Sequence, residues 1–258
     1  MAVSETSMKT RDLPESEELQ PTLSIVIPAF NEAARIGNSI HEIRSFIESS
    51  PLSIEVIVVD DGSVDATAEI VRRLANRSLR LLRNDENHGK GYSVRQGVLN
   101  ARGTYVLFTD ADLSAPIGEL SKLLDVAVRD GVDVVIGSRA ADRTTIEKRQ
   151  TRFRELGGIG FNKAVRLLLG LNISDTQCGF KLFHRERTRA VFEKQTTFGF
   201  GFDPEILFLA HRRGLRIREV PVRWSHSEGS KLNPVRDGLR MFGDLARIRW
   251  NDLIGRYR

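Results

Sequence analysis

The sequence contains 258 residues, and its 40% hydrophobic and 28% charged content is typical of a soluble globular protein with one large or two small domains. No apolar run approaches the about 20 residues that a membrane-spanning helix needs. The single cysteine, Cys178, excludes an intramolecular disulfide bond and fits a reducing compartment. The net charge of +5 is uneven: residues 1–138 carry 14 basic and 21 acidic side chains, whereas residues 139–258 carry 25 and 13. The basic half could face phosphates, an anionic membrane surface or nucleic acid, or could be a solvated surface.

Residues 1–20 are rich in Ser, Glu and Thr and contain no apolar core, so we expect a disordered or tag-like tail. Strands and helices then alternate for about 115 residues. Short β-branched runs predict strands at 23–27, 54–59, 79–82, 105–108 and 132–136. Apolar residues at helical spacing predict a helix after each of the first four strands, with Asn31 capping the first helix and Asp65 the second. This alternation predicts an α/β fold with a mostly parallel central sheet and helices on both faces.

Polar clusters follow four of the predicted strands, at residues 28–32, 60–63, 110–112 and 138–139. Ligands of parallel α/β sheets bind beyond the carboxyl ends of the strands. One polar strand end would mean little, because it could simply cap the next helix. Four such ends on one edge of the sheet predict a binding site.

Asp110 and Asp112 stand one residue apart at a strand end, so both carboxylates can face the same ligand. Two close carboxylates repel each other, and a hard divalent cation that also binds diphosphate oxygens would suit them. The first strand–helix turn lacks the G-x-G-x-x-G of dinucleotide-binding folds, and the Gly-rich turn at 87–91 lacks the P-loop frame. The first half is therefore expected to bind a nucleoside by hydrogen bonds and its diphosphate through a metal ion at Asp112.

Three segments, 28–32 (PAFNE), 60–67 (DDGSVDAT) and 110–113 (DADL), resemble successive motifs of family 2 glycosyltransferases with the GT-A, Rossmann-like fold. In the second half, segments 175–181, 202–207 and 229–232 are similar to the dolichyl-phosphate glucose synthase branch of that family. This branch neighbours the dolichyl- and polyprenyl-phosphate mannose synthases. The resemblance covers about residues 22–250. It implies one domain at 21–250, with a nucleotide-sugar half at 21–138, an acceptor half at 139–250, and a basic C-terminal tail at 251–258.

The resemblance also implies roles for individual residues. Asp110 and Asp112 would hold Mg²⁺ or Mn²⁺ with the diphosphate, and Ser114 stands where mannose synthases place a polar group beside the metal. Arg139, and less surely Arg152, would meet the acceptor phosphate or the diphosphate. The residues expected to hold the nucleoside are Pro28, Phe30, Glu32 and Asp61. Two lysines complete the expected substrate contacts: Lys90 in the Gly-rich turn, and Lys231, which would close over the diphosphate on a mobile loop.

Asp175 and Asp203 have two possible explanations each. Asp175 lies among small and apolar residues, where a carboxylate needs a partner. That partner would be an arginine or Lys181, in either a structural ion pair or a substrate-binding role. Asp203 and Glu205 precede a predicted helix at 206–212, where they could either complement the helix dipole or contact the sugar or acceptor. Cys178 is expected to be a small buried hydrophobe rather than a nucleophile.

The segment 156–171 is an apolar helix with basic residues on one side, and it could lie in a membrane interface or pack in the core. The same two alternatives apply to the Arg- and Trp-containing C-terminus, whose Leu239, Phe242, Leu245 and Ile248 could pack on the domain. Eukaryotic members of the glucose branch begin with a membrane anchor that this sequence does not show. We therefore expect a peripheral protein on the cytoplasmic face of a membrane.

These observations predict an inverting enzyme that moves a hexose from UDP-glucose or GDP-mannose to a polyprenyl or dolichyl phosphate, with glucose favoured over mannose. Arg139, Asp112, Asp203 and Lys231 would be its catalytic residues. One alternative is a family 2 enzyme acting on a glycan or glycolipid hydroxyl, with Asp203 or Glu205 as general base. Another is a non-catalytic sugar-nucleotide-binding or membrane-associated module. Nucleic acid is not an expected partner, because no recognition motif accompanies the basic residues.

Overall fold

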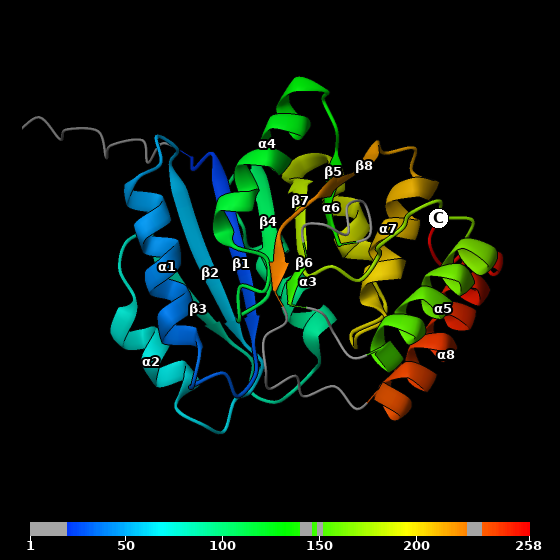
Figure 1. Ribbon diagram of the computed structural model, residues 1–258, viewed down its shortest axis with the longest axis horizontal. Helices are drawn as coiled ribbons and strands as arrows, with labels where there is room; N and C mark the ends of the chain where they lie inside the picture. Colours follow the sequence, from blue (N-terminus) through cyan, green and yellow to red (C-terminus); the bar gives the residue numbers. More distant parts are fainter. Residues whose placement is uncertain (1–19, 140–145, 149–151, 226–233) are drawn as a thin grey trace, which may run out of the picture.

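The computed structural model describes residues 20–139, 146–148, 152–225 and 234–258 (Figure 1). The predicted tail at 1–20, apart from residue 20, and Lys231 lie outside the described residues. A mixed sheet forms the centre of the molecule, and within the described residues it has seven strands in the order β3-β2-β1-β4-β7-β5-β8. These strands are β1 (Leu23–Ala29), β2 (Ile54–Asp60), β3 (Leu79–Arg83), β4 (Tyr105–Thr109), β5 (Val134–Ser138), β7 (Phe180–His184) and β8 (Ile217–Pro221).

All neighbouring strands run parallel except around β7, which pairs antiparallel with both β4 and β5. The expected mostly parallel sheet is therefore confirmed, with one antiparallel strand inserted from the second half of the chain. Strands β1, β2 and β5 are buried along their whole length, which explains why their sequences are continuous apolar runs rather than alternating ones. A small second sheet pairs β6 (Ile146–Lys148) with β9 (Trp224–Ser225).

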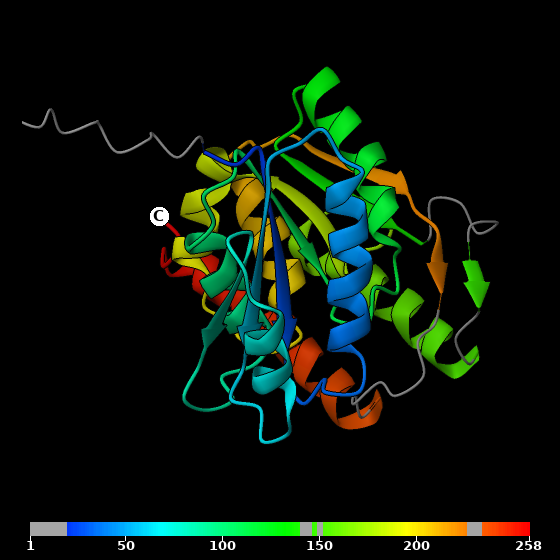
Figure 2. The ribbon, with the colours of Figure 1, turned by 90° about the vertical axis from the view of Figure 1, so that its left-hand side faces the viewer.

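Helices cover both faces of the sheet (Figure 2). One apolar cluster joins the sheet to α1 (Ile36–Glu48), α2 (Thr67–Leu74) and α4 (Leu120–Arg129). A second cluster on the other face joins it to α3 (Lys90–Leu99), α5 (Arg152–Leu169), α6 (Arg185–Lys194), α7 (Phe202–Arg212) and α8 (Pro234–Leu253). Helices α5 and α8 lie side by side at the edge of the molecule (Figure 1). None of the helices within the described ranges is long and apolar enough to span a bilayer.

One local expectation differs from the structure. Asn31 does not cap α1, which begins only at Ile36; it adopts a left-handed φ of 54° instead. The helix after β4 is preceded by a 3₁₀ turn, η1 (Ile117–Glu119), which follows the extended Pro116. In the segment 251–258, α8 continues to Leu253 and the Tyr257 side chain is buried.

Candidate active site

The two aspartates of the central motif lie directly after β4. The backbone turns sharply there: Leu113 has a φ of 47°, its N–H donates to the Asp110 carbonyl at 3.1 Å, and the Ser114 N–H donates to Asp112 Oδ1 at 3.0 Å. The side chains of Asp110 and Asp112 remain 32% and 21% exposed. This turn points two partly solvated carboxylates beyond the edge of the sheet, as the residue spacing predicts.

Two cations lie beside these carboxylates. Lys90 Nζ is 2.6 Å from Asp110 Oδ1, and Arg35 Nη1 is 3.7 Å from Asp112 Oδ2. Arg35 also contacts Glu32 through its Nε at 2.7 Å, so Glu32 holds this cation beside Asp112. A contact of Glu32 with a nucleoside stays a prediction. Burial alone would lower the pKa of Lys90, but Asp110, Asp203 and Asp112 together raise it above its usual value. Lys90 is therefore a permanent cation at the predicted diphosphate position.

Asp61 organises the turn that carries Lys90. Its carboxylate accepts hydrogen bonds from the His88 N–H at 3.1 Å, the Gly89 N–H at 2.8 Å and Asn84 Nδ2 at 2.7 Å. Gly89 has a φ of 104°, which non-glycine residues rarely adopt. A contact of Asp61 with a nucleoside stays a prediction. Any such contact would share a buried carboxylate that already fixes the Gly-rich turn.

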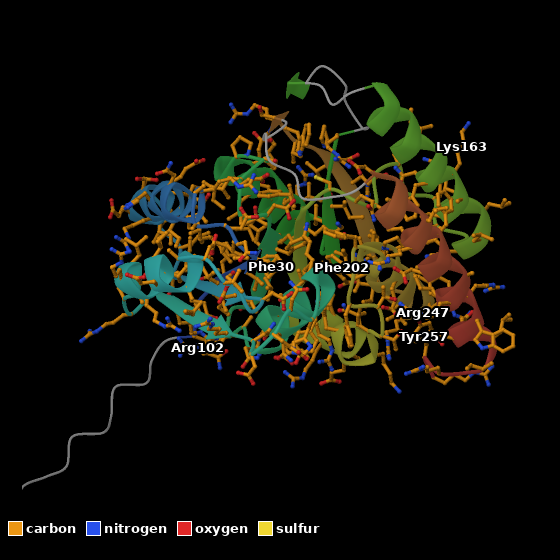
Figure 3. The ribbon with its side chains drawn as sticks, turned by 90° about the horizontal axis from the view of Figure 1, so that it is seen from below. Phe30, Arg102, Lys163, Phe202, Arg247 and Tyr257 are labelled. Atoms are coloured by element: carbon orange, nitrogen blue, oxygen red, sulfur yellow. The ribbon has the colours of Figure 1, made fainter. Side chains whose placement is uncertain are left out.

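The first polar turn is hydrogen-bonded to the second. The Asn31 N–H donates to Ser63 Oγ at 2.8 Å, the Asn31 side chain accepts from the Val64 N–H at 2.9 Å, and the Glu32 N–H donates to Thr67 Oγ1 at 2.7 Å. Just before this turn, Phe30 is 36% exposed; Figure 3 labels it in a view onto this edge of the sheet. The buried Pro28 lies within β1. Phe30 is thus the candidate of this turn that presents an open surface to a ligand.

A divalent cation fits the Asp110–Asp112 pair by the chemistry of its donors. Both side chains supply carboxylate oxygens, the ligands that Mg²⁺ and Mn²⁺ prefer, and both reach solvent. The described residues contain no group of three or more His, Cys, Asp and Glu side chains that could enclose a metal ion. A cation here would therefore take its remaining ligands from a substrate or from water.

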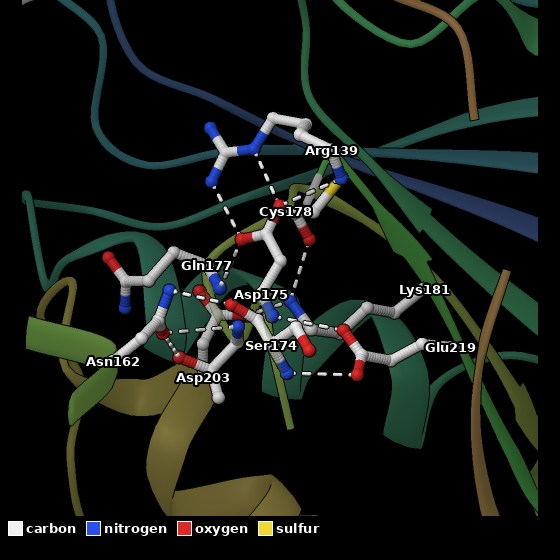
Figure 4. A network of polar contacts seen from close by, with 10 residues as sticks. Arg139, Asn162, Ser174, Asp175, Gln177, Cys178, Lys181, Asp203 and Glu219 are labelled. Atoms are coloured by element: carbon white, nitrogen blue, oxygen red, sulfur yellow. Dashed lines mark hydrogen bonds and ion pairs between the residues drawn. The ribbon is translucent and has the colours of Figure 1, made fainter. Parts of the chain in front are cut away.

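Arg139 and Asp175 form the second half of the site (Figure 4). The Asp175 carboxylate accepts from Arg139 Nε at 2.7 Å, Arg139 Nη2 at 2.8 Å and the Arg139 backbone N–H at 3.0 Å. Burial alone would raise the pKa of Asp175, but Arg139 holds it below its usual value. The Arg139 guanidinium also lies 5.4 Å from the centre of the Trp224 ring and keeps 25% of its side chain exposed. Arg139 is therefore a fixed cation with an open side.

Glu219 on β8 fixes the Asp175 loop through hydrogen bonds to its backbone. The two carboxylate oxygens of Glu219 accept from the Ser174 N–H at 2.8 Å and the Asp175 N–H at 2.9 Å (Figure 4). The same loop reaches the two-aspartate motif, because the Asp110 N–H donates to the Gly179 carbonyl at 3.2 Å. A Cβ at position 179 would also collide with the Asp110 carboxylate. The Arg139 cation and the two-aspartate motif therefore belong to one site.

Lys181 pairs with Asp203 rather than with Asp175. Its Nζ is fully buried and lies 2.5 Å from Asp203 Oδ1 and 2.7 Å from the Cys178 carbonyl. Burial raises the pKa of Asp203, while Lys181 and Lys90 oppose the increase. Burial likewise raises the pKa of the Cys178 thiol to about 12, in agreement with the prediction that this cysteine is no nucleophile.

Glu205 lies in a separate structural cluster. It is completely buried, accepts from the Thr196 and Thr197 N–H groups at 3.0 Å and 2.6 Å, and accepts from the Tyr257 hydroxyl at 2.6 Å. Asp203 and Glu205 both lie inside the first turn of α7, not before it. Glu205 thus links Tyr257, near the end of the chain, to α7, and its hydrogen bonds to Thr196, Thr197 and Tyr257 hold the fold together.

The structure brings most of the predicted site residues to one edge of the sheet. The residues placed there by direct contacts are Glu32, Asp61, Lys90, Asp110, Asp112, Ser114, Arg139 and Asp175, with Asp203 beneath them. Arg152 begins α5, but its side chain and all of Lys231 lie outside the description. Sequence reasoning missed Arg35 and Glu219. Arg35 follows Glu32 at the i+3 spacing of a helical ion pair, a signal that could have identified it.

Comparison with known proteins agrees with this arrangement. The family model described as "Glycosyl transferase family 2" matches residues 24–192. Dolichyl-phosphate beta-glucosyltransferases from Drosophila melanogaster and Homo sapiens are 37% and 34% identical, covering 98% and 92% of this chain and 82% and 77% of theirs. Among solved structures, mannosyl-3-phosphoglycerate synthase from Rubrobacter xylanophilus matches with a TM-score of 0.67 at 22% identity, over 92% of this chain and 75% of that one.

Glucosyl-3-phosphoglycerate synthase from Mycobacterium tuberculosis, solved with Mn²⁺, UDP-glucose and phosphoglyceric acid, matches with a TM-score of 0.63 at 22% identity. It covers 92% of this chain and 80% of its own. At this identity the two solved structures establish the shared GT-A fold. The family model and the curated relatives together show that this chain belongs to glycosyl transferase family 2.

Proposed function

We propose that this protein transfers a hexose, glucose in preference to mannose, from a nucleoside-diphosphate sugar to a dolichyl or polyprenyl phosphate with inversion at the anomeric carbon. The observation that carries the proposal is the Arg139–Asp175 pair: the Arg139 cation directly after β5 is held by the loop that also contacts Asp110. A cation next to the donor site suits an acceptor that is itself a phosphate. The names of the curated relatives support the same acceptor and the same sugar.

The donor half would bind the diphosphate. Asp110 and Asp112 would hold Mg²⁺ or Mn²⁺, which supplies positive charge to the departing nucleoside diphosphate when bound. Lys90 adds a second positive charge 2.6 Å from Asp110. UDP-glucose is the favoured donor because related folds were solved with UDP-glucose and Mn²⁺. GDP-mannose is the second choice, since a mannosyltransferase of this fold was solved with GDP-mannose and Mn²⁺.

The proposed acceptor removes the need for a strong general base. A phosphate monoester has a second pKa of about 6, so its oxygen is largely ionised at neutral pH and is already nucleophilic. Arg139 would orient that oxygen toward the anomeric carbon. The new carbon–oxygen bond forms as the bond to the diphosphate breaks, and the leaving group takes the electron pair.

The hydroxyl-acceptor alternative requires a general base, for which Asp203 and Glu205 are the candidates. Asp203 is 5% exposed and bound to Lys181, and Glu205 is fully buried and saturated by Thr196, Thr197 and Tyr257. Glu205 exposes no oxygen, and Asp203 exposes little surface and has its Oδ1 held by Lys181, whereas a base beside a sugar hydroxyl needs an accessible oxygen. These contacts support the phosphate acceptor. Of the predicted catalytic residues, Asp112 and Arg139 keep that role in this proposal, and Lys90, predicted as a substrate contact, is added to them.

We also propose that the protein attaches peripherally to the cytoplasmic face of a membrane through α5 and α8. Among the described side chains, large apolar groups are exposed on α8 at Leu239, Phe242, Trp250 and Leu253, and on α5 at Ile159, Leu167 and Leu168. Basic residues accompany them, and Lys163 projects outward from α5 (Figure 3). Leu245 and Ile248 pack inward, so α8 has two apolar sides. An exposed apolar side flanked by cations is typical of an interfacial helix.

Vesicle flotation tests this attachment. We expect the protein to float with phosphatidylserine vesicles but not with phosphatidylcholine vesicles, and we expect added salt to weaken its binding to phosphatidylserine.

The direct test is transfer of radiolabelled sugar from UDP-glucose and from GDP-mannose to a polyprenyl phosphate, with Mg²⁺, Mn²⁺ or a chelator. We expect label in a glycolipid, more from UDP-glucose than from GDP-mannose, and none with chelator. Metal-dependent release of nucleoside diphosphate without labelled lipid would contradict the phosphate acceptor and favour a hydroxyl acceptor. Donor binding without any turnover would support the non-catalytic module instead.

A further inference from the structure

A pocket lies between the loop before α7 and the middle of α8. Two glycines line it together with Phe200, Met241, Arg240, Asp244 and Arg247. The Phe200 ring is 37% exposed, so it presents an apolar surface. The methylene stems of the two arginines add to that surface while their charged ends can reach solvent. The pocket is thus an apolar recess with a cationic mouth.

The charges of this mouth are unequal. Arg247 Nη2 is 2.7 Å from Asp244 Oδ1, so that pair is neutral overall. Arg240 makes no ion pair with any side chain in the part of the chain that the structure describes. The recess therefore carries one uncompensated positive charge, which favours an anionic amphiphile over a neutral hydrocarbon or a cationic ligand.

One residue connects this pocket to the candidate active site. Gln177 Nε2 donates to the Phe200 carbonyl at 3.4 Å, and the Gln177 N–H donates to Asp175 Oδ1 at 3.3 Å. Asp175 in turn holds Arg139. On the donor side, the Gly91 N–H of the turn that carries Lys90 donates to the Phe198 carbonyl at 2.7 Å, two residues before Phe200. The loop that walls the pocket therefore also borders the active site.

We propose that this pocket holds the first isoprene units of the acceptor, while Arg139 holds its phosphate. The inference rests on the proposed function, which supplies the phosphate, and adds a specific place for the hydrocarbon next to it. Phe200 and Met241 contact the chain, and the Arg240 cation lies at the mouth.

The test uses a series of acceptors of increasing length: dimethylallyl, geranyl and farnesyl phosphate, each below its micelle concentration, with radiolabelled UDP-glucose. Each added unit that buries the equivalent of two methylenes improves acceptor affinity roughly 15-fold. We expect the acceptor KM of the wild-type protein to fall with chain length by about this factor per unit until the pocket is full. In Phe200→Ser and Met241→Ser the dependence on length falls to a few-fold, because the loss of affinity is larger for farnesyl phosphate than for dimethylallyl phosphate.

Val128→Ser, a matched loss of an exposed apolar side chain on α4, serves as the control and leaves the series unchanged. An unchanged length dependence in both pocket variants would overturn the proposal, and so would an equal loss for all three acceptors. If the wild-type protein transfers sugar to none of them, the proposed function fails. Calorimetric binding of farnesyl phosphate then tests separately whether the pocket binds an isoprenoid chain. Binding that Phe200→Ser weakens supports the site, whereas no binding overturns it.

Discussion

The substitution Asp175→Asn tests the central ion pair of the site. Asp175 is 2% exposed and accepts three hydrogen bonds from Arg139, two from the guanidinium and one from the backbone. Asparagine keeps the shape but retains one acceptor oxygen, and its amide group would face guanidinium donors. The variant thus leaves a cation without its buried partner, as in other broken buried ion pairs.

The expected cost is about 3 kcal/mol of unfolding free energy, the lower end for a broken buried pair, because Arg139 is 25% exposed and can recruit water. For a protein of this size that corresponds to a fall in Tm of roughly 6 to 12 °C. Arg139 should also lose its orientation, so the KM for a phosphate acceptor should rise more than the KM for the donor. Thermal unfolding and two-substrate kinetics measure the two effects.

The pH dependence gives a second check. The folded-state pKa of Asp175 lies below its usual value of 3.8, so its stabilising contribution is fully present above that value. The contribution is lost as the pH falls through the depressed folded-state pKa. The Tm difference between wild type and variant should therefore be constant above about pH 5 and should shrink in more acid solution.

A matched control is Asp130→Asn, which alters an exposed ion pair with Arg129. This control should have the same Tm as the wild-type protein, because exposed ion pairs contribute little to stability. If Asp175→Asn also had the Tm of the wild-type protein, the conclusion that this ion pair fixes Arg139 would be refuted.

Three further substitutions test other parts of the site. Gly179→Ala places a methyl group against the Asp110 carboxylate, so Mn²⁺ binding and sugar transfer should fall while the circular dichroism spectrum is retained. An unchanged Mn²⁺ affinity would count against a metal role for Asp110. Tyr257→Phe removes the hydrogen bond to Glu205 and should lower the unfolding free energy, measured by chemical denaturation, by about 1.5 to 3 kcal/mol, with wild-type turnover per folded molecule. A large loss of turnover would show that Glu205 is not merely structural. Asp203→Asn should lower the transfer rate moderately; complete loss of chemistry with intact donor binding would instead indicate a general base and a hydroxyl acceptor.

The sequence predicted the donor half well because its signals are local. Short β-branched runs identified β1, β2 and β4 to within two residues, since a buried parallel strand needs continuous apolar side chains. The positions of Asp110 and Asp112 followed from the same reasoning, because a strand end fixes where the next side chains point. Boundaries governed by tertiary contacts were less accurate: Asn31 does not cap α1 but accepts a hydrogen bond from Val64 in the neighbouring loop.

The acceptor half needed the tertiary structure. Sequence reasoning left either an arginine or Lys181 as the partner of Asp175, and it could not choose between a core helix and an interfacial helix at the C-terminus. The structure selects Arg139 for Asp175 and shows that α8 packs Leu245 and Ile248 inward while Leu239 stays 70% exposed. Both outcomes depend on elements far apart in the sequence.

The sequence by itself thus determined the α/β architecture, the edge of the sheet that carries the site and the carboxylates that face it. Only the tertiary structure decided which charges pair. Strand β7 enters antiparallel between β4 and β5, and its register sets Lys181 opposite Phe108 on one side and Ile136 on the other. Side chains alternate across a sheet, so a shift of one residue would have turned Lys181 to the opposite face, away from Asp203. That register is a product of packing between distant strands, which the spacing of residues along the chain does not encode.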